Sequence, residues 1–213
     1  AKPGHGGVLP GPKVTAEIAA ARGVPVGVDC VSPASHSAFN TPVEMMRFIR
    51  RLRELSGGKP VGFKTVIGSG EWLEDLFQEI RRRGLQSAPD FITLDSGDGG
   101  TGAAPMALID NVGLPIRESL PIVVDLLHKY GLKERIRLIA SGKLTTPANV
   151  AYALCMGADF VTSARGFMFA LGCIQSLRCN KNTCPTGITT HDPHLQRGLV
   201  PADKAGRVTS APC

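Results

Sequence analysis

The sequence predicts an α/β fold built on a parallel sheet. Short runs rich in β-branched and aromatic residues alternate with longer segments whose apolar residues recur at helical spacing. Polar, glycine-rich segments follow the β-rich runs. The 213 residues are 43% hydrophobic and 20% charged, which is typical of a globular domain. Since alternating strands and helices are the pattern of crossover-connected parallel strands, we expect a barrel or a doubly wound sheet.

Strands are expected where short apolar runs stand between turn residues. One run near residues 24–31 is less regular, and four later runs are clear. Each clear run combines β-branched or aromatic residues with glycine, proline or polar residues at its boundaries. These four strands are expected at residues 61–67, 91–94, 136–140 and 160–162.

Helices are expected before and between these strands, because apolar residues there recur three and four positions apart. Gly84, Gly131 and Gly157 supply stops, and Thr146 with Pro147 supplies an N-cap and a first helical residue. The four helices are expected at residues 41–55, 71–83, 117–130 and 146–157, with inward-facing residues Met46, Ile49 and Leu52, then Leu73, Leu76, Phe77 and Ile80, then Ile122, Leu126, Leu127 and Tyr130, and last Val150 and Leu154.

The loops after the strands favour a barrel. DSGDGGTGAAP follows Leu94, SGKLTTP follows Ala140 and SARG follows Thr162. In a (β/α)8 barrel the active site is built from loops at the carboxyl ends of the strands, and phosphate commonly binds after the seventh and eighth strands. A whole barrel takes about 250 residues, and only four strands are clear. We therefore expect the C-terminal part of a (β/α)8 TIM barrel, as one domain over residues 1–213.

The formal charge of +6 is partly local. Two arginine-rich runs lie on expected helices, and solvated helix faces are the favoured interpretation. An anionic ligand is the alternative, and nucleic acid is disfavoured because no aromatic platform or known binding motif accompanies the charge. The two runs are Arg47, Arg50, Arg51 and Arg53, and Arg81, Arg82 and Arg83.

Hydropathy and cysteine content indicate the compartment. Apolar runs fall short of the roughly 18 residues that a membrane helix needs, and no secretory signal is visible. Six cysteines without such a signal indicate a reducing compartment, so we expect a cytoplasmic protein that does not bind membranes. Cys30 and Cys155 lie in apolar stretches and are expected to be small core residues.

Three further cysteines are closely spaced near the C-terminal end. Cys173, Cys179 and Cys184 lie in GCIQSLRCNKNTCPTGI with the spacing C-x5-C-x4-C. Three thiolates so close in sequence can hold an iron–sulfur cluster. A zinc site completed by His191 or His194 is an alternative, as are free thiols. The spacing alone leaves these alternatives open.

Several segments together resemble one family. They are, in order, AKPGHGGVLPGPKV, GVDCVSPASHSAFNT, DSGDGGTGAAP, LIASGKLTTPANV, SARGFMFALGCI and CNKNTCPTGITTHDP. Over about residues 1–208 the chain is similar to the FMN- and iron–sulfur-binding synthase domain of glutamate synthase. It is more similar to the stand-alone glutamate synthase-like FMN proteins than to the large multidomain enzyme.

The resemblance implies a barrel that carries FMN and a three-iron (3Fe-4S) cluster. The cluster ligands would be Cys173, Cys179 and Cys184, within the loop 172–188. The implied reaction is the reduction of 2-iminoglutarate, formed from 2-oxoglutarate and ammonia, to glutamate. Electrons would pass from the cluster to FMN, and a ferredoxin or an NAD(P)H-linked subunit would be the donor.

The implied flavin site draws on the loops after the strands and on one strand residue. Lys64 stands mid-strand in VGFKTVI, where a lysine is costly unless it faces a polar site. Glycines let backbone N–H groups approach a phosphate closely, although plain βα turns are the alternative interpretation. The candidate FMN residues are Lys64, Asp98, Gly99, Gly100, Thr101, Ser141, Gly142, Lys143, Ala164, Arg165 and Gly166.

The implied substrate residues lie in the first part of the chain. Lys2 and Arg22 match family residues that contact the 2-oxoglutarate carboxylates, and His5 and His36 are candidate catalytic proton donors. The large synthases read KPGEGGQLPG, whereas Val8 stands here in place of the glutamine and cannot hydrogen-bond a carboxylate. Two alternatives therefore stay open: an FMN barrel enzyme acting on another 2-oxo acid or imine, and an inactive truncated fragment.

Overall fold

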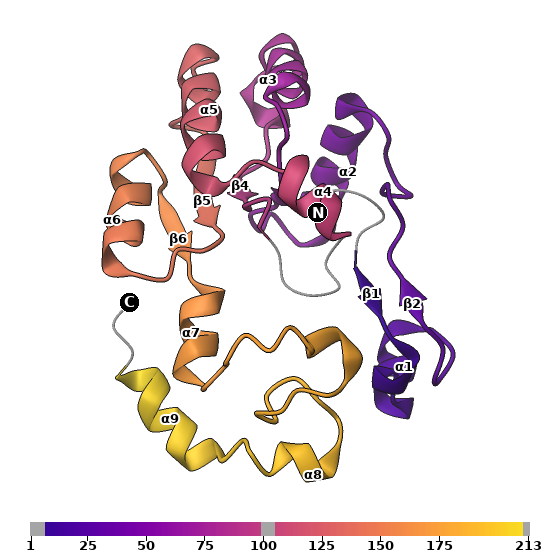
Figure 1. The fold of residues 1–213 in the computed structure, drawn as a ribbon. Helices are drawn as coiled ribbons and strands as arrows, with labels where there is room; N and C mark the ends of the chain where they lie inside the picture. The colour runs from indigo at the N-terminus through magenta and orange to yellow at the C-terminus, as the bar shows by residue number, and fades with distance from the viewer. Residues whose placement is uncertain (1–6, 99–104, 211–213) are drawn as a thin grey trace.

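The computed structural model describes residues 7–98 and 105–210. Strands and helices alternate through the middle of the chain, as the sequence predicts (Figure 1). The elements are β1 (Val8–Leu9), η1 (Gly11–Lys13), α1 (Ala16–Arg22), β2 (Cys30–Val31), α2 (Pro42–Leu55), β3 (Phe63–Thr65), α3 (Glu71–Arg83), η2 (Leu85–Ser87), β4 (Phe91–Leu94), α4 (Met106–Asn111), α5 (Ile116–Lys129), β5 (Arg137–Ser141), α6 (Pro147–Cys155), β6 (Phe160–Thr162), α7 (Ala164–Ala170), η3 (Cys179–Lys181), α8 (Pro193–Gln196) and α9 (Pro201–Thr209).

The central sheet has four parallel strands in the order β3-β4-β5-β6. Each strand pairs with the next one in the chain, so every connection is a crossover that contains a helix. This confirms the α/β class and the parallel sheet. Within the described residues the sheet is open, with β3 and β6 at its edges, and no closed barrel is seen.

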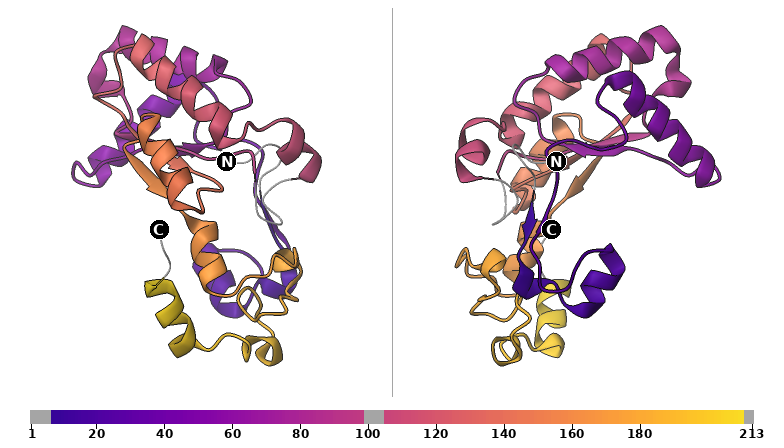
Figure 2. Two further views of the ribbon diagram at one scale, coloured as in Figure 1. Left: turned by 60° about the vertical axis from the view of Figure 1, so that its left-hand side comes forward. Right: turned by 90° about the vertical axis from the view of Figure 1, so that its right-hand side faces the viewer.

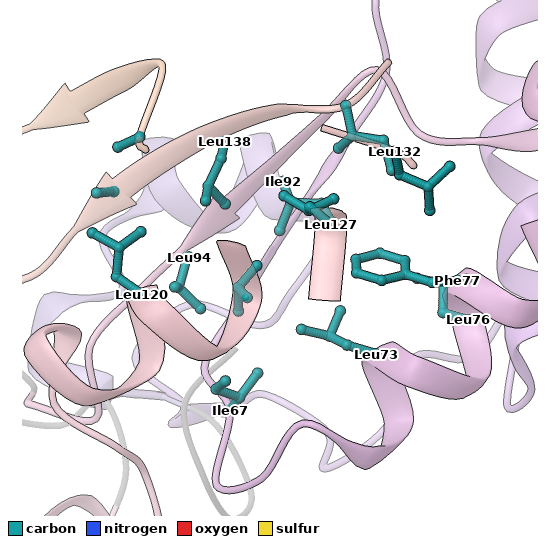
Figure 3. Close-up of a cluster of buried hydrophobic side chains, with 14 of the residues drawn as sticks. Ile67, Leu73, Leu76, Phe77, Ile92, Leu94, Leu120, Leu127, Leu132 and Leu138 are labelled. Atoms are coloured by element: carbon teal, nitrogen blue, oxygen red, sulfur yellow. The ribbon is translucent and has the colours of Figure 1, made fainter. Parts of the chain in front are cut away.

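Helices α3 and α5 pack against one face of this sheet and form the core with it (Figure 3). Leu73, Leu76, Phe77 and Ile80 of α3 are all fully buried, as their spacing predicts. They meet fully buried residues of the two central strands, among them Ile92, Leu94 and Leu138. The burial of a continuous apolar face between two helices and a sheet is the main term that stabilises this layer.

The predicted inward face of α5 is wrong by part of a turn. The buried apolar residues are Ile116, Leu120, Val123 and Leu127, spaced four, three and four positions apart, so Leu127 alone of the predicted face is confirmed. Ile122, Leu126 and Tyr130 are only partly buried and flank the core. The space above Gly70 explains this, because the side chains of Ile122 and Leu126 lie close to the position that a Cβ would take there. These residues therefore cover the start of α3 rather than the sheet.

Four other expectations at the ends of elements are corrected. Leu52 and Leu154 are exposed, whereas α2 buries Met46 and Ile49 as predicted and α6 buries Ala153. Cys155, expected in the core, is exposed at the last position of α6. The strand expected near residues 24–31 is limited to β2, which pairs antiparallel with β1 and stands apart from the parallel sheet.

The N-terminal segment packs on the cysteine loop that follows α7. Lys13 at the end of η1 donates hydrogen bonds from Nζ to the carbonyl oxygens of Cys179, at 2.5 Å, and Thr189, at 2.7 Å. Figure 2 shows β1 next to the orange segment that follows α7, below the sheet in both views. Helix α9 packs against α7 and completes this lower layer.

Candidate functional site

A cavity of about 180 Å³ lies at the carboxyl ends of the four parallel strands. In α/β folds these ends are where ligands bind, because the loops of neighbouring strands converge there. Seven of the eleven predicted FMN residues line it, which the sequence could only place in separate loops. Its lining is Lys64, Asp95, Asp98, Ser141, Gly142, Lys143, Leu144, Thr162, Ala164 and Arg165.

Lys64 reaches the cavity from β3 and is paired with Asp95, which directly follows β4. Their Nζ and Oδ2 atoms lie 2.9 Å apart, with the Lys64 side chain 54% exposed and that of Asp95 10% exposed. A carboxylate buried to this extent needs a partner, and the ammonium supplies one. Asp95 also accepts a hydrogen bond from the N–H of Ser96 at 2.9 Å. The ion pair therefore keeps the Lys64 ammonium group at the rim of the cavity.

Asp98 connects the loop after β4 with the loop after β5. Lys143 donates to its Oδ1 at 2.5 Å, and the hydroxyl of Ser96 donates to its Oδ2 at 2.8 Å. Burial opposes ionisation of Asp98. The hydrogen bonds from Lys143 and Ser96, with the charges of Lys143 and Arg165, nevertheless hold the pKa of this carboxyl below its ordinary value. Asp98 is thus an anion that binds Lys143 and is stabilised by the charge of Arg165.

Gly142 allows these two loops to meet. Its φ is +109°, and a Cβ added there would lie 2.2 Å from the Cβ of Ser96. Only glycine fits both the dihedral angle and the space. Lys143, the next residue, also has a positive φ of 50°, which turns its chain toward Asp98. The sequence predicts a glycine of this kind, but not its contact with Ser96.

The loops after β5 and β6 are also connected to each other. The hydroxyl of Ser163 donates to the carbonyl oxygen of Leu144 at 2.5 Å. Gly166 lies in α7 behind this contact, and a Cβ there would lie 2.8 Å from the Ser163 hydroxyl. Ala164 and Arg165 line the cavity, whereas Gly166 stands behind them. The role of Gly166 in this structure is to give the Ser163 side chain room.

His36 lines a second, larger cavity of about 560 Å³ between the segment before α2 and strand β3. Lys64 lines both cavities, so the two predicted residues are close to one another. The His36 ring stacks on Phe39 with centroids 4.4 Å apart. The N–H of Ala38 donates to His36 Nδ1 at 3.1 Å, so in the neutral ring the proton is on Nε2. His36 is therefore oriented and able to donate.

The other predicted substrate and loop residues either lie outside the described part of the chain or line neither of these cavities. Lys2, His5, Gly99, Gly100 and Thr101 lie outside the described residues. Arg22 is the exposed last residue of α1, before Gly23, where a cation is stabilised by the helix dipole. It lines neither of the two cavities. Val8 pairs with Val31 in the small antiparallel sheet.

The cysteine loop has the donor chemistry of a metal centre, but its side chains are not gathered as ligands. Among residues 7–98 and 105–210, no group of three or more His, Cys, Asp or Glu side chains is placed to hold a metal ion. Cys173 and Cys179 are half-buried, and Cys184 is buried. The Cys184 sulfur lies 3.3 Å from the Thr186 hydroxyl. As described, the loop does not fit a cluster without a rearrangement, and the cluster stays a prediction.

The surroundings of Cys184 favour a thiolate. Burial acts to raise its pKa, but hydrogen bonds from the hydroxyls and the backbone of Thr186 and Thr189 lower the pKa to about 6. The thiolate is the form of cysteine that binds metal ions and iron–sulfur clusters.

Comparison with known proteins assigns the family. Residues 1–210 match the family described as the conserved region in glutamate synthase. The chain belongs to the glutamate synthase family. It is 49% identical over 204 residues to the glutamate synthase large subunit-like protein YerD of Bacillus subtilis, a match that covers 96% of this chain and 38% of that protein.

The chain also matches only part of two further members of the glutamate synthase family. The archaeal glutamate synthase (NADPH) of Methanocaldococcus jannaschii is 38% identical over 210 residues, which is 99% of this chain and 40% of that protein. The glutamate synthase (NADPH) large chain of Bacillus subtilis is 32% identical over 200 residues, which is 94% of this chain and 13% of that protein. The chain thus spans two fifths or less of the length of these three relatives.

In this glutamate synthase family member, Asp95, Ser96 and Lys13 lie within the matched motifs but were not predicted as site residues. A signal for Asp95 exists, because an acid that directly follows a strand is placed at its carboxyl end. The side-chain contact of Ser96 with Asp98 and the contacts of Lys13 with the cysteine loop depend on tertiary structure. In the described residues, no helix is long and apolar enough to cross a membrane.

Proposed function

We propose that this chain forms the flavin-binding part of a glutamate synthase-like oxidoreductase. The proposed reaction is the FMN- and iron–sulfur-dependent reductive amination of 2-oxoglutarate, through 2-iminoglutarate, to glutamate. The observation that carries the proposal is the cavity at the carboxyl ends of β3, β4, β5 and β6, where seven predicted FMN residues from four strands and loops converge. The membership in the glutamate synthase family supports it.

The charges around the cavity suit a phosphate. Lys64, Lys143 and Arg165 line it together with Asp95 and Asp98, which leaves one positive charge in excess. Its volume of about 180 Å³ is smaller than the roughly 300–1,000 Å³ of a site for a whole organic ligand. We therefore assign to it the phosphate end of FMN, with Lys143 and Arg165 as the cations and Gly142 as the close-approach residue.

Lys64 is the residue that links the phosphate cavity to the substrate side. It lines the larger cavity together with His36, and its ammonium group is paired with the Asp95 carboxylate. In our proposal, FMN when bound supplies the hydride for the imine. Lys64 binds an anionic group of flavin or substrate, and the Nε2–H of His36 donates a hydrogen bond to the developing amine nitrogen.

Flavin binding by the full chain is the first test. We expect FMN to bind the wild type, with quenching of its fluorescence, and we expect Lys143→Gln to weaken binding about tenfold. Arg197→Gln, an exposed residue remote in sequence from the cavity, is the matched control and should leave the affinity unchanged. Equal affinities of wild type and Lys143→Gln would contradict the phosphate assignment. Absence of FMN binding would favour a non-catalytic fragment.

Turnover is the second test and separates two substrates. The apolar Val8, paired with Val31, favours a second candidate in which another 2-oxo acid is aminated. The full-length protein, loaded with flavin and cluster and supplied with an artificial electron donor, should form glutamate from 2-oxoglutarate and ammonia. Faster amination of a 2-oxo acid that lacks the second carboxylate would select the second candidate, and no amination at all would reject both.

A further inference from the structure

A second charged cavity lies at the other end of the sheet. It has a volume of about 730 Å³ and runs along one face of α2 toward the C-terminal end of α3. We call it the arginine groove. Its lining is Val43, Met46, Arg47, Arg50, Arg53, Glu54, Gly57, Gly58, Arg83, Gln86 and Ser87.

The place of the arginine groove separates it from the flavin cavity. Gly57 and Gly58 precede β3, and Gln86 and Ser87 precede β4. The groove is therefore at the amino-terminal ends of the strands, whereas the flavin cavity is at their carboxyl ends. A ligand in the groove would leave the proposed FMN residues accessible.

Positive charge is concentrated around this groove. Residues 47–59 and 79–90 together contain eight Arg or Lys and three Asp or Glu. Their net charge is therefore +5, whereas the net charge of the whole chain is +6. Helix dipoles favour cations in the last turn of α2 and of α3. They do not account for Arg47 and Arg50, which lie in the middle of α2. Both are exposed and one turn apart, so they share a face.

The base of the groove is held by structural contacts. Arg53 donates from its Nη2 to Asp90 Oδ2 at 2.8 Å and to the Ala88 carbonyl oxygen at 2.9 Å, so its orientation is set. Met46 is only 3% exposed and provides an apolar floor with Val43. The groove thus has a buried apolar floor and an exposed cationic rim.

The cations of the rim are only weakly engaged by the protein. Arg50 pairs with Glu54 at 2.9 Å across one helical turn, and both side chains are more than half exposed. Exposed pairs of this kind contribute only about 0.3–0.5 kcal/mol. Arg83 pairs with Glu79 at 3.0 Å, and this pair is less exposed, with the Arg83 side chain 35% exposed. A ligand with a higher charge density can therefore take Arg50 from Glu54.

We propose that the arginine groove is a binding site for a small polyanion that carries two or more phosphate or carboxylate groups. Guanidinium groups bind both groups through paired N–H donors. The volume lies within the range of small-molecule sites. None of its lining residues, all of them in the described part of the chain, is aromatic, so a nucleobase has no stacking partner there. This favours a small polyanion over nucleic acid.

Calorimetric titration of the full chain tests the proposal with pyrophosphate and citrate as probes. We expect at least one of them to bind, and Arg47→Gln/Arg50→Gln to weaken that binding at least tenfold. Arg83→Gln, on a different element, should weaken it about threefold. Arg197→Gln/Arg207→Gln removes the same charge elsewhere and should change it less than twofold. Tighter pyrophosphate binding indicates a phosphorylated ligand, and tighter citrate binding a polycarboxylate.

One variant separates this site from the flavin cavity, which could also take pyrophosphate. Lys143→Gln should leave the affinity unchanged if the probe binds in the arginine groove. Loss of binding in Lys143→Gln, equal weakening in the two double variants, or absence of binding by the wild type would each overturn the proposal. The circular dichroism spectrum of each variant checks that it is folded, which is expected because Arg47 and Arg50 are exposed.

Discussion

Lys13 donates a hydrogen bond to the carbonyl oxygen of Cys179 across 166 positions of sequence, at 2.5 Å. A second bond from the same ammonium group reaches the carbonyl oxygen of Thr189 at 2.7 Å. One side chain thus joins both ends of the segment that contains Cys179 and Cys184 to the N-terminal part of the chain. A cation between two carbonyl groups can hold this loop without any covalent link.

Replacing Lys13 by methionine should loosen the cysteine loop. Loss of two charge-assisted hydrogen bonds should lower the free energy of unfolding by about 2–3 kcal/mol, measured by urea denaturation. Amide hydrogen exchange should accelerate over residues 179–189. Lys13→Arg should recover part of the loss, and the exposed Lys59→Met should be neutral. Equal exchange rates in Lys13→Met and wild type would show that the contact does not hold the loop.

Gly142→Ala should disrupt the flavin cavity. The new Cβ would lie 2.2 Å from the Ser96 Cβ, and the alanine would have to adopt a φ of +109°. Strain and overlap together should lower the free energy of unfolding by about 3 kcal/mol or more, and FMN binding should be lost.

Gly131→Ala is the matched control for this substitution. Gly131 has a φ of +61°, but an added Cβ meets no atom within 4 Å. We expect Gly131→Ala to lower the free energy of unfolding by only about 1 kcal/mol and to leave FMN binding unchanged. Thermal unfolding and flavin titration of both variants check this. Equal destabilisation in the two variants would argue against the contact between Gly142 and Ser96.

Asp90→Asn should reveal a pH-dependent contribution to stability. Burial opposes ionisation of Asp90, but hydrogen bonds from the Val61 N–H, Arg53 and Arg135 hold its pKa below the ordinary 3.8. Because the folded-state pKa is the lower one, the contribution is fully present above pH 3.8 and is lost as the pH falls through the folded-state pKa. At neutral pH we expect Asp90→Asn to lower the free energy of unfolding by about 2–3 kcal/mol.

Urea denaturation at a series of pH values measures this difference. The gap between wild type and Asp90→Asn should shrink as the pH is lowered beyond 3.8. Asp125→Asn, at an exposed position of α5, should change stability by no more than about 0.5 kcal/mol at any pH. A gap that stays constant with pH would mean that Asp90 acts through packing and not through its charge.

Cys184→Ser should abolish the proposed cluster. After anaerobic reconstitution with iron and sulfide, the wild type should contain three irons per cluster and absorb in the visible range. Cys184→Ser should lack both the bound iron and the visible absorbance. Cys155→Ser is the control, because Cys155 is exposed on α6 and outside the cysteine loop. Binding of zinc in place of iron would instead support a site completed by His191 or His194.

Local patterns were sufficient for much of the α/β layer. The limits predicted for α3 and β4 coincide with those observed, because apolar spacing, Gly84 and the flanking turn residues all agree there. The seven predicted residues that line the flavin cavity could also be predicted from the sequence, since polar residues after parallel strands meet at one end of a sheet. Periodicity failed for α5, where Ile122 and Leu126 keep helical spacing but cover α3.

The sequence by itself determined the family, the order of strands and helices, and the residue types at the carboxyl ends of the strands, because these follow from local spacing and from motifs. Only the tertiary structure decided which groups meet. Asp95 with Lys64, Ser96 with Gly142, and Lys13 with Cys179 are contacts between segments distant in sequence. No periodicity encodes such contacts, because they depend on how the crossovers bring separate loops to one place in space.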